Sequence, residues 1–163
     1  KNTFVGHPLI EDTDTNKTDI NNLISNDALF AKGHVIHDLK LNVIWLRCSV
    51  GQVWNEKECV GKPLKFKISE VDAIIKQANN QLEGDWRLPN RKELENIVCM
   101  TCGKVKINSK FFPNTPYEPF WTGEKNDWSK NKDFYWSVNF FTGHTFGRFP
   151  GHIPNFVRLV KDR

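Results

Sequence analysis

The sequence predicts an α+β fold in which two helices pack on a mainly antiparallel sheet of short strands. Three observations predict this class: helical periodicity in the middle of the chain, short apolar runs bounded by turn residues, and many aromatic side chains. Aromatic residues make up 12% of the 163 residues, with six Trp and twelve Phe. Such residues favour the packed surface of a sheet, and a chain of this length can build one core.

The chain is predicted to divide into a polar N-terminal extension, residues 1–28, and a single domain, residues 29–163. The domain begins with residues 29–47, which are predicted to form two strands separated by a turn near Lys40. Their apolar runs are short and are bounded by polar residues, as is typical of strands.

Oxygen-bearing side chains alternate in the extension as they do in a calcium-binding loop. Asp12, Asp14 and Asn16 stand at loop positions 1, 3 and 5, so calcium is a candidate cofactor. Lys17 stands where that loop requires glycine, and Leu23 stands where a bidentate glutamate belongs. A solvated extension is therefore favoured over a calcium site, and no other cofactor is indicated.

Two helices are predicted in the middle of the chain. The second helix begins after Asn90, which forms a capping box with Glu93, and it ends before Gly103. Trp86 lies between the helices and is predicted to be a buried anchor. The first helix begins after the N-cap Ser69, and its buried face follows the 3.6-residue period: Val71, Ile74, Ile75, Ala78 and Leu82.

Short strands are predicted to fill the last third of the chain. Alternation of polar and apolar residues favours a hairpin closed by a turn at Thr142-Gly143. The predicted elements, in order, are a strand at 120–122, a polar loop at 123–133, a strand at 134–141, its hairpin partner at 144–149 and a final strand at 156–160.

Four cysteines, an even number, favour two structural disulfides and an oxidising compartment. Cys48 and Cys59 enclose a short, turn-rich loop and are predicted to bond to each other. A redox-active pair needs a helix N-terminus, whereas Cys99 and Cys102 lie at a predicted helix end. Zinc needs two closely spaced pairs, and Cys48 and Cys59 are too far apart in sequence. Whether Cys99 bonds to Cys102 stays open at this point.

Charge and motif content favour binding over catalysis. The net charge of +4 is too modest and too dispersed for a nucleic-acid-binding protein, and no apolar run could span a membrane. The chain shows no nucleophile–base pair and no phosphate-binding glycine loop. Five histidines occur, but the spacing of His34 and His37 would place them on opposite faces of a strand. We therefore expect no enzymatic activity.

The predicted ligand surface is the polar loop together with the last hairpin. Trp128 stands among three lysines there, and an exposed Trp can stack on a sugar while lysines contact sulfate or phosphate. An acidic polysaccharide is the ligand that such a surface would suit. In the alternative reading, Trp128 folds back onto the core and the lysines form a solvated face. The predicted ligand-binding residues are Trp128, Lys125, Lys130, Lys132, His144 and Arg148.

A series of short motifs resembles one known family. The most specific motif is Asp85-Trp86-Arg87-Leu88-Pro89-Asn90-Arg91-Lys92-Glu93-Leu94. Together the motifs resemble the bacterial secreted-domain family of unknown function that includes the C-terminal domain of the Legionella collagen-like adhesin, over roughly residues 30–163. The other motifs are Val43-Ile44-Trp45, Arg47-Cys48-Ser49-Val50-Gly51-Gln52, Phe112-Pro113-Asn114-Thr115, Trp136-Ser137-Val138-Asn139-Phe140 and Val157-Arg158-Leu159-Val160.

The resemblance implies a C-type-lectin-like fold and an exported protein, which would be periplasmic, cell-surface or secreted. It also implies adhesion or ligand binding, with sulfated glycosaminoglycans associated with that adhesin domain. The shared motifs occupy structural positions, so they transfer no binding residue. Two other classes remain: a structural subunit of a surface or fibre assembly, which would be homo-oligomeric, and an enzyme with a lectin-like fold.

Overall fold

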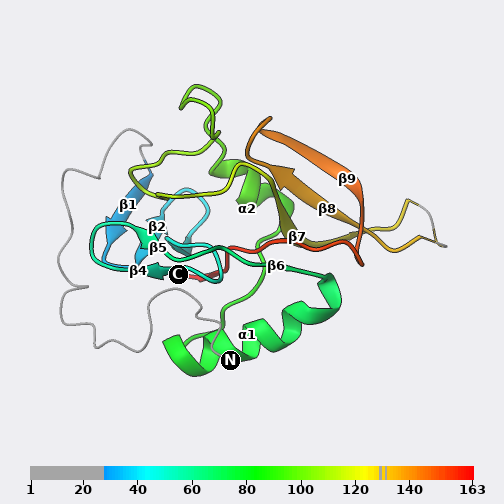
Figure 1. Ribbon diagram of the computed structural model, residues 1–163, viewed down its shortest axis with the longest axis horizontal. Helices are drawn as coiled ribbons and strands as arrows, with labels where there is room; N and C mark the ends of the chain where they lie inside the picture. The colour runs from blue at the N-terminus through cyan, green and yellow to red at the C-terminus, as the bar shows by residue number, and fades with distance from the viewer. Residues whose placement is uncertain (1–27, 129, 131) are drawn as a thin grey trace.

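Two sheets and two helices build the structure, a computed structural model that describes residues 28–128, 130 and 132–163. The fold is α+β with mainly antiparallel sheets, as predicted. Where the sequence suggested one sheet, the structure has two larger sheets and a two-stranded ribbon, β4 (Val53–Trp54) with β5 (Cys59–Val60). In Figure 1 the first sheet lies on the left, the second on the right, and α1 (Ile68–Leu82) runs below them.

The first sheet has the strand order β1-β2-β3-β11, and all its pairings are antiparallel. The segment 29–47 was predicted to hold two strands and holds three. Gly33, with a φ of 64°, permits the extra turn between the first two of them. The strands are β1 (Leu29–Lys32), β2 (Val35–Asp38), β3 (Val43–Leu46) and β11 (Val160–Asp162).

The second sheet has the strand order β6-β10-β7-β8-β9, in which only the pairing of β10 with β7 is parallel. The hairpin formed by β8 and β9 was predicted, and Gly143, with a φ of 80°, lies in its turn. The strands are β6 (Lys65–Phe66), β7 (Pro119–Asn126), β8 (Phe134–Asn139), β9 (His144–Pro150) and β10 (Asn155–Phe156).

Strand β7 is longer than the sequence suggested. It was expected to end at Thr122, but it continues to Asn126 through a register shift between Trp121 and Lys125. At Gly123 the chain passes close to Leu88, since a Cβ there would lie 3.2 Å from the Leu88 Cβ, and the Gly123 N–H donates to the Pro89 carbonyl at 2.8 Å. The first residues of the expected polar loop therefore belong to the sheet.

The predicted final strand, 156–160, is two short strands in different sheets. β10 pairs with β6 and β7, whereas β11 pairs with β3. Between them the backbone still bonds to the start of the domain, because the Val157 carbonyl accepts from Val50 and the Leu159 carbonyl accepts from Leu46. The chain end thus ties the two sheets together.

Helix α1 has the predicted buried face but a different start. It begins at Ile68, after Lys67, and not after Ser69. The reason is that the Lys67 backbone N–H donates to the carboxylate of Glu70 at 2.8 Å, which caps the helix from inside its first turn. The fully buried members of the apolar face are Val71, Ile74 and Ala78.

Helix α2 (Arg91–Asn96) has the predicted capping box. Asn90 Oδ1 accepts from the Glu93 backbone N–H at 2.8 Å, and Glu93 Oε1 accepts from the Asn90 N–H at 2.9 Å. The helix ends well before Gly103, because the chain after it forms an antiparallel bridge between Val98 and Ile107. Cys99 and Cys102 accordingly lie in a loop and not on a helix.

The junction between the helices is held by the buried Trp86 and by ion pairs of Arg87. Trp86 is 3% exposed, and its backbone N–H donates to Asn79 Oδ1 at 2.8 Å. Arg87 bonds to both carboxylate oxygens of Glu93 and reaches Asp162 of β11 at 2.8 Å. Burial alone would raise the pKa of Glu93, but the hydrogen bonds from Arg87 and from the Asn90 N–H, together with the charge of Arg87, outweigh it and keep the pKa below its usual value.

Candidate functional site

The loop between β7 and β8 brings an exposed tryptophan against β9. The Trp128 side chain is 65% exposed, and the Arg148 guanidinium carbon lies 4.5 Å from the centre of its ring. Asn126 fixes this arrangement at both ends. Its Oδ1 accepts from the Trp128 N–H at 3.0 Å, and its Nδ2 donates to the Gly147 carbonyl at 2.6 Å. A large aromatic face is thus held out of the core and presented to solvent.

An open pocket of about 440 Å³ lies beside this tryptophan. Trp136 of β8 contributes a second indole, and the backbone of Gly147 lies against it. A Cβ at Gly147 would come within 2.5 Å of the Trp136 ring, so the close approach depends on glycine. Six of the residues that line the pocket carry side chains: Asn126, Trp128, Trp136, Thr145, Phe146 and Arg148.

An arginine guanidinium lies over each indole ring of the pocket, but the two arginines differ in their ion-pair partners. The Arg91 guanidinium lies 3.9 Å from the centre of the Trp136 ring, and its Nε lies 3.8 Å from Glu124 Oε1. Within the described ranges, Arg148 has no ion pair with a carboxylate. Arg148 is therefore the cation that is open to an anionic ligand.

The predicted lysines are spread around the tip of the loop. Lys125 lies on β7, and its Nζ is 3.6 Å from Asp133 Oδ1, so its charge is partly offset. Lys130 and Lys132 are exposed near the tip, where they add positive charge without lining the pocket. His144 lies at the other end of β9, about 14 Å along the strand from Arg148. The structure thus brings Trp128 and Arg148 together and leaves His144 apart.

Sequence reasoning missed four residues that shape this pocket. Trp136 was named only as part of a predicted strand and of a family motif; β8 and β9 shift register between Tyr135 and Ser137, and Trp136 is half-buried at the pocket. An Asn two positions before Trp128 was a usable signal, since Asn side chains often cap such turns. Arg91 and Glu124 gave no signal, because their neighbours come from distant segments. The four missed residues are Asn126, Trp136, Arg91 and Glu124.

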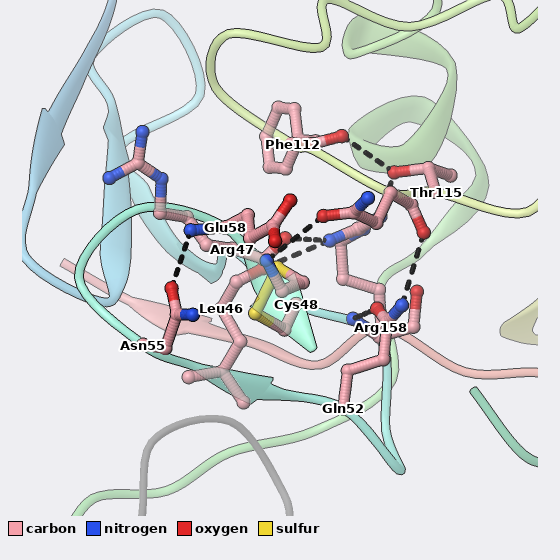
Figure 2. Close-up of a disulfide and its surroundings, with 12 residues drawn as sticks. Leu46, Arg47, Cys48, Gln52, Asn55, Glu58, Phe112, Thr115 and Arg158 are labelled. Atoms are coloured by element: carbon pink, nitrogen blue, oxygen red, sulfur yellow. Dashed lines mark hydrogen bonds between the residues drawn. A yellow bond between two sulfur atoms is a disulfide. The ribbon is translucent and has the colours of Figure 1, made fainter. Parts of the chain in front are cut away.

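A second cation–aromatic cluster is buried near the first disulfide (Figure 2). Arg158 is 1% exposed, and its guanidinium carbon lies 4.8 Å from the centre of the Phe112 ring. It donates to Thr115 Oγ1 at 2.7 Å and to the carbonyls of Leu46 and Arg47. Burial lowers the pKa of Arg158, yet a guanidinium keeps its charge at neutral pH. This cluster is closed to ligands and holds the fold.

Both cysteine pairs form disulfides. Cys48 bonds to Cys59, and the question left open by the sequence is answered by a bond between Cys99 and Cys102. The first bond is buried, and Trp54 packs on it with Arg47 lying 4.1 Å above the Trp54 ring. The described cysteines include no free thiol.

The predicted calcium ligands Asp12, Asp14 and Asn16 lie outside the described residues. Within the described ranges, no group of three or more His, Cys, Asp and Glu side chains is placed to hold a metal ion. The helices of that part of the chain also lack the length and apolar character that a membrane crossing needs.

The fold and the pocket define a small, disulfide-linked α+β domain with an aromatic and cationic surface. The chain belongs to the Lcl C-terminal domain family, whose model matches residues 34–161. No curated protein and no solved structure matches the chain significantly. The matched region includes the whole pocket, since its lining residues lie between Asn126 and Arg148.

Proposed function

We propose that this domain is an exported, adhesin-related module that binds an acidic glycan at the Trp128–Arg148 pocket without catalysing a reaction. The observation that carries the proposal is an exposed indole held beside a cation that has no carboxylate partner in the described residues. An indole face stacks on the C–H face of a sugar, and an open guanidinium binds carboxylate or sulfate in a bidentate manner. Family membership and two disulfides support export and an adhesin-related role.

The family also supports a finer statement about the fold. We propose that the two sheets and two helices form a C-type-lectin-like domain, in which the chain end joins the first sheet next to β3. Folds of this type carry many ligands, so the pocket and not the fold supports the glycan assignment. No metal or organic cofactor is part of this proposal.

Binding of immobilised heparin, compared with neutral dextran, tests the proposed function. Wild type is expected to bind heparin at low salt and to lose affinity at physiological salt, because exposed charge pairs are screened. Trp128→Ala and Arg148→Gln are each expected to weaken binding about tenfold, since the loss of one stacking or one charged contact of about 1.4 kcal/mol corresponds to that factor. The matched control is Phe141→Ala, which removes another exposed aromatic, 49% exposed, from the far end of the hairpin.

Three outcomes would change the proposal in different ways. If wild type binds neither polymer at low salt, the glycan function is wrong and a structural subunit of a surface assembly becomes the better reading. If wild type binds heparin and both pocket variants bind equally well, the function stands and the site is wrong. If Phe141→Ala weakens binding as much as Trp128→Ala, the ligand covers the whole hairpin.

A further inference from the structure

The two disulfides of the domain differ in their access to solvent. Cys48 and Cys59 are 2% and 3% exposed, and Trp54 packs on their bond. By contrast, Cys102 is exposed and Cys99 is half-buried. Their bond lies in the loop after α2, which projects in Figure 1 on the side opposite α1. A thiol in solution can therefore reach the second bond, whereas the first bond is shielded by the core.

The loop that carries the second bond is also held by backbone hydrogen bonds. The Cys99 N–H donates to the Lys106 carbonyl at 2.8 Å, and the Lys106 N–H donates to the Phe140 carbonyl at 2.7 Å. The disulfide itself spans three positions, so it restricts the unfolded chain less than the bond between Cys48 and Cys59, which spans 11. Reduction of the second bond is therefore expected to leave the fold in place.

Two groups beside the second bond suit the negative charge that a leaving sulfur develops. Thr101 Oγ1 lies 3.8 Å from Cys99 Sγ, within reach of a hydrogen bond to sulfur. Lys106 Nζ donates at 2.7 Å to the carbonyl of Gly103, the residue after Cys102. Hydrogen-bond donors and nearby cations favour a thiolate over a thiol. The negative end of a helix dipole would oppose that charge, but α2 ends before both cysteines.

We propose that the Cys99–Cys102 bond is a thiol-exchange site, open in the folded protein to a dithiol reductant. One thiolate of the reductant attacks Cys102 Sγ, the more exposed sulfur, and forms a mixed disulfide, while Cys99 leaves as a thiolate and takes up a proton. The second thiol of the reductant then attacks the mixed disulfide and releases Cys102 as a thiol. Two electrons and two protons thus pass from the reductant, which ends as a disulfide, to the two cysteines. This site is separate from the glycan pocket and does not depend on its function.

Alkylation of the native protein after partial reduction tests the access to each bond. The folded chain is incubated with dithiothreitol without denaturant, and thiols are trapped with N-ethylmaleimide at intervals and located by peptide mapping. We expect Cys99 and Cys102 to be labelled at least about tenfold faster than Cys48 and Cys59, because a buried bond reacts only when the structure opens. Equal rates for the two pairs in the folded protein would overturn the proposal.

Circular dichroism of the partly reduced protein separates exchange from unfolding. The spectrum and the thermal melt are expected to stay close to those of the oxidised protein once Cys99 and Cys102 are labelled. Loss of the native spectrum at that stage would show that the bond holds the fold, and the proposal would fail.

A monothiol identifies the sulfur that is attacked. After brief reaction with glutathione and an acid quench, peptide mapping is expected to find the glutathione on Cys102 and a free thiol at Cys99. Glutathione mainly on Cys99 would contradict the assigned direction of attack.

The role of the nearby cation is tested with Lys106→Gln, whose amide can still donate to the Gly103 carbonyl. We expect reduction by dithiothreitol to slow about twofold, the size of effect that one charge near a developing thiolate predicts. The matched control is Lys76→Gln, an equal change of charge at an exposed position of α1. An equal effect of the two variants would show that Lys106 does not assist the exchange.

Discussion

Among the arginines that lie on aromatic rings in the described part of the chain, Arg158 and Arg148 have opposite surroundings. Arg158 is buried against Phe112, and its two Nη atoms donate to a hydroxyl and to backbone carbonyls. Arg148 lies on the exposed Trp128, in solvent. The comparison shows that a cation–aromatic contact does not by itself indicate a binding site. What matters is whether the guanidinium is exposed, because a buried guanidinium whose Nη atoms already have partners cannot reach a ligand.

The largest expected effect separates the buried tryptophans from the exposed one. Trp86→Ala should lower the free energy of unfolding by about 3–5 kcal/mol, since it opens a cavity at the junction of the helices. Trp128→Ala should change it by less than about 0.5 kcal/mol, as is usual for an exposed side chain. Urea denaturation followed by circular dichroism measures both. A loss under about 1 kcal/mol for Trp86→Ala would show that this junction is not part of the core.

Removal of the first disulfide should have the next largest effect. The Cys48→Ala, Cys59→Ala double variant is expected to lose about 3 kcal/mol, because the bond closes a loop of 11 positions in the unfolded chain. The matched control is the Cys99→Ala, Cys102→Ala variant, whose bond spans three positions and constrains the unfolded chain less. Thermal melts compare the two variants, and equal losses would contradict the loop-entropy argument.

Replacing the two arginines tests the comparison directly. Arg158→Met fills similar space but removes the donors of the Leu46 and Arg47 carbonyls, so we expect a loss of about 2 kcal/mol in stability. Arg148→Met should leave stability unchanged and weaken glycan binding. Urea denaturation measures the stability of both variants, and the heparin assay measures their glycan binding. Loss of stability in Arg148→Met would mean that its contact with Trp128 holds the fold and is not available to a ligand.

The smallest expected effect is a change of stability with pH that is caused by His37, which lies near three positively charged side chains. Burial, followed by the charges of Arg163, Lys32 and Lys161, lowers the pKa of His37 from 6.5 to about 4. Between these values the unfolded chain takes up a proton that the folded chain does not, so stability falls as the pH falls from 6.5 to 4. Because the ring is half exposed, we expect about 1 kcal/mol.

His37→Asn provides the measurement for that effect. The difference in unfolding free energy between wild type and this variant should change with pH between 6.5 and 4 and stay constant above pH 7. Carboxylates contribute equally to both proteins, so the difference isolates the histidine. A difference that does not change with pH would show that His37 is protonated equally in the folded and unfolded chain.

Local features of the fold could be predicted, because the interactions that determine them involve residues that are close together in the sequence. The Asn90–Glu93 capping box needs only its own turn, and the buried face of α1 follows from periodicity. The Cys48–Cys59 bond followed from the short, turn-rich loop between the cysteines. The α+β class needed no more than these elements and the strand patterns.

Long-range placements could not be predicted from such patterns. Arg158 stands in an apolar run whose alternation gives no sign that its side chain enters a polar cage in the core. Trp128 and Arg148 were both named as site residues, but their contact depends on how the loop after β7 folds over β9. Trp136 was missed because a bulge in the pairing of β8 with β9 overrides simple alternation.

The pairing of β11 with β3 has a consequence for the time course of folding. Arg158 lies 112 positions from Leu46, whose carbonyl it contacts, and Val160 pairs with Trp45 in the same region. The first sheet therefore cannot close until nearly the whole domain has been synthesised, and such non-local pairing is slow. A nascent chain that is held open in this way acquires its native form only after the last strand becomes available to pair with β3.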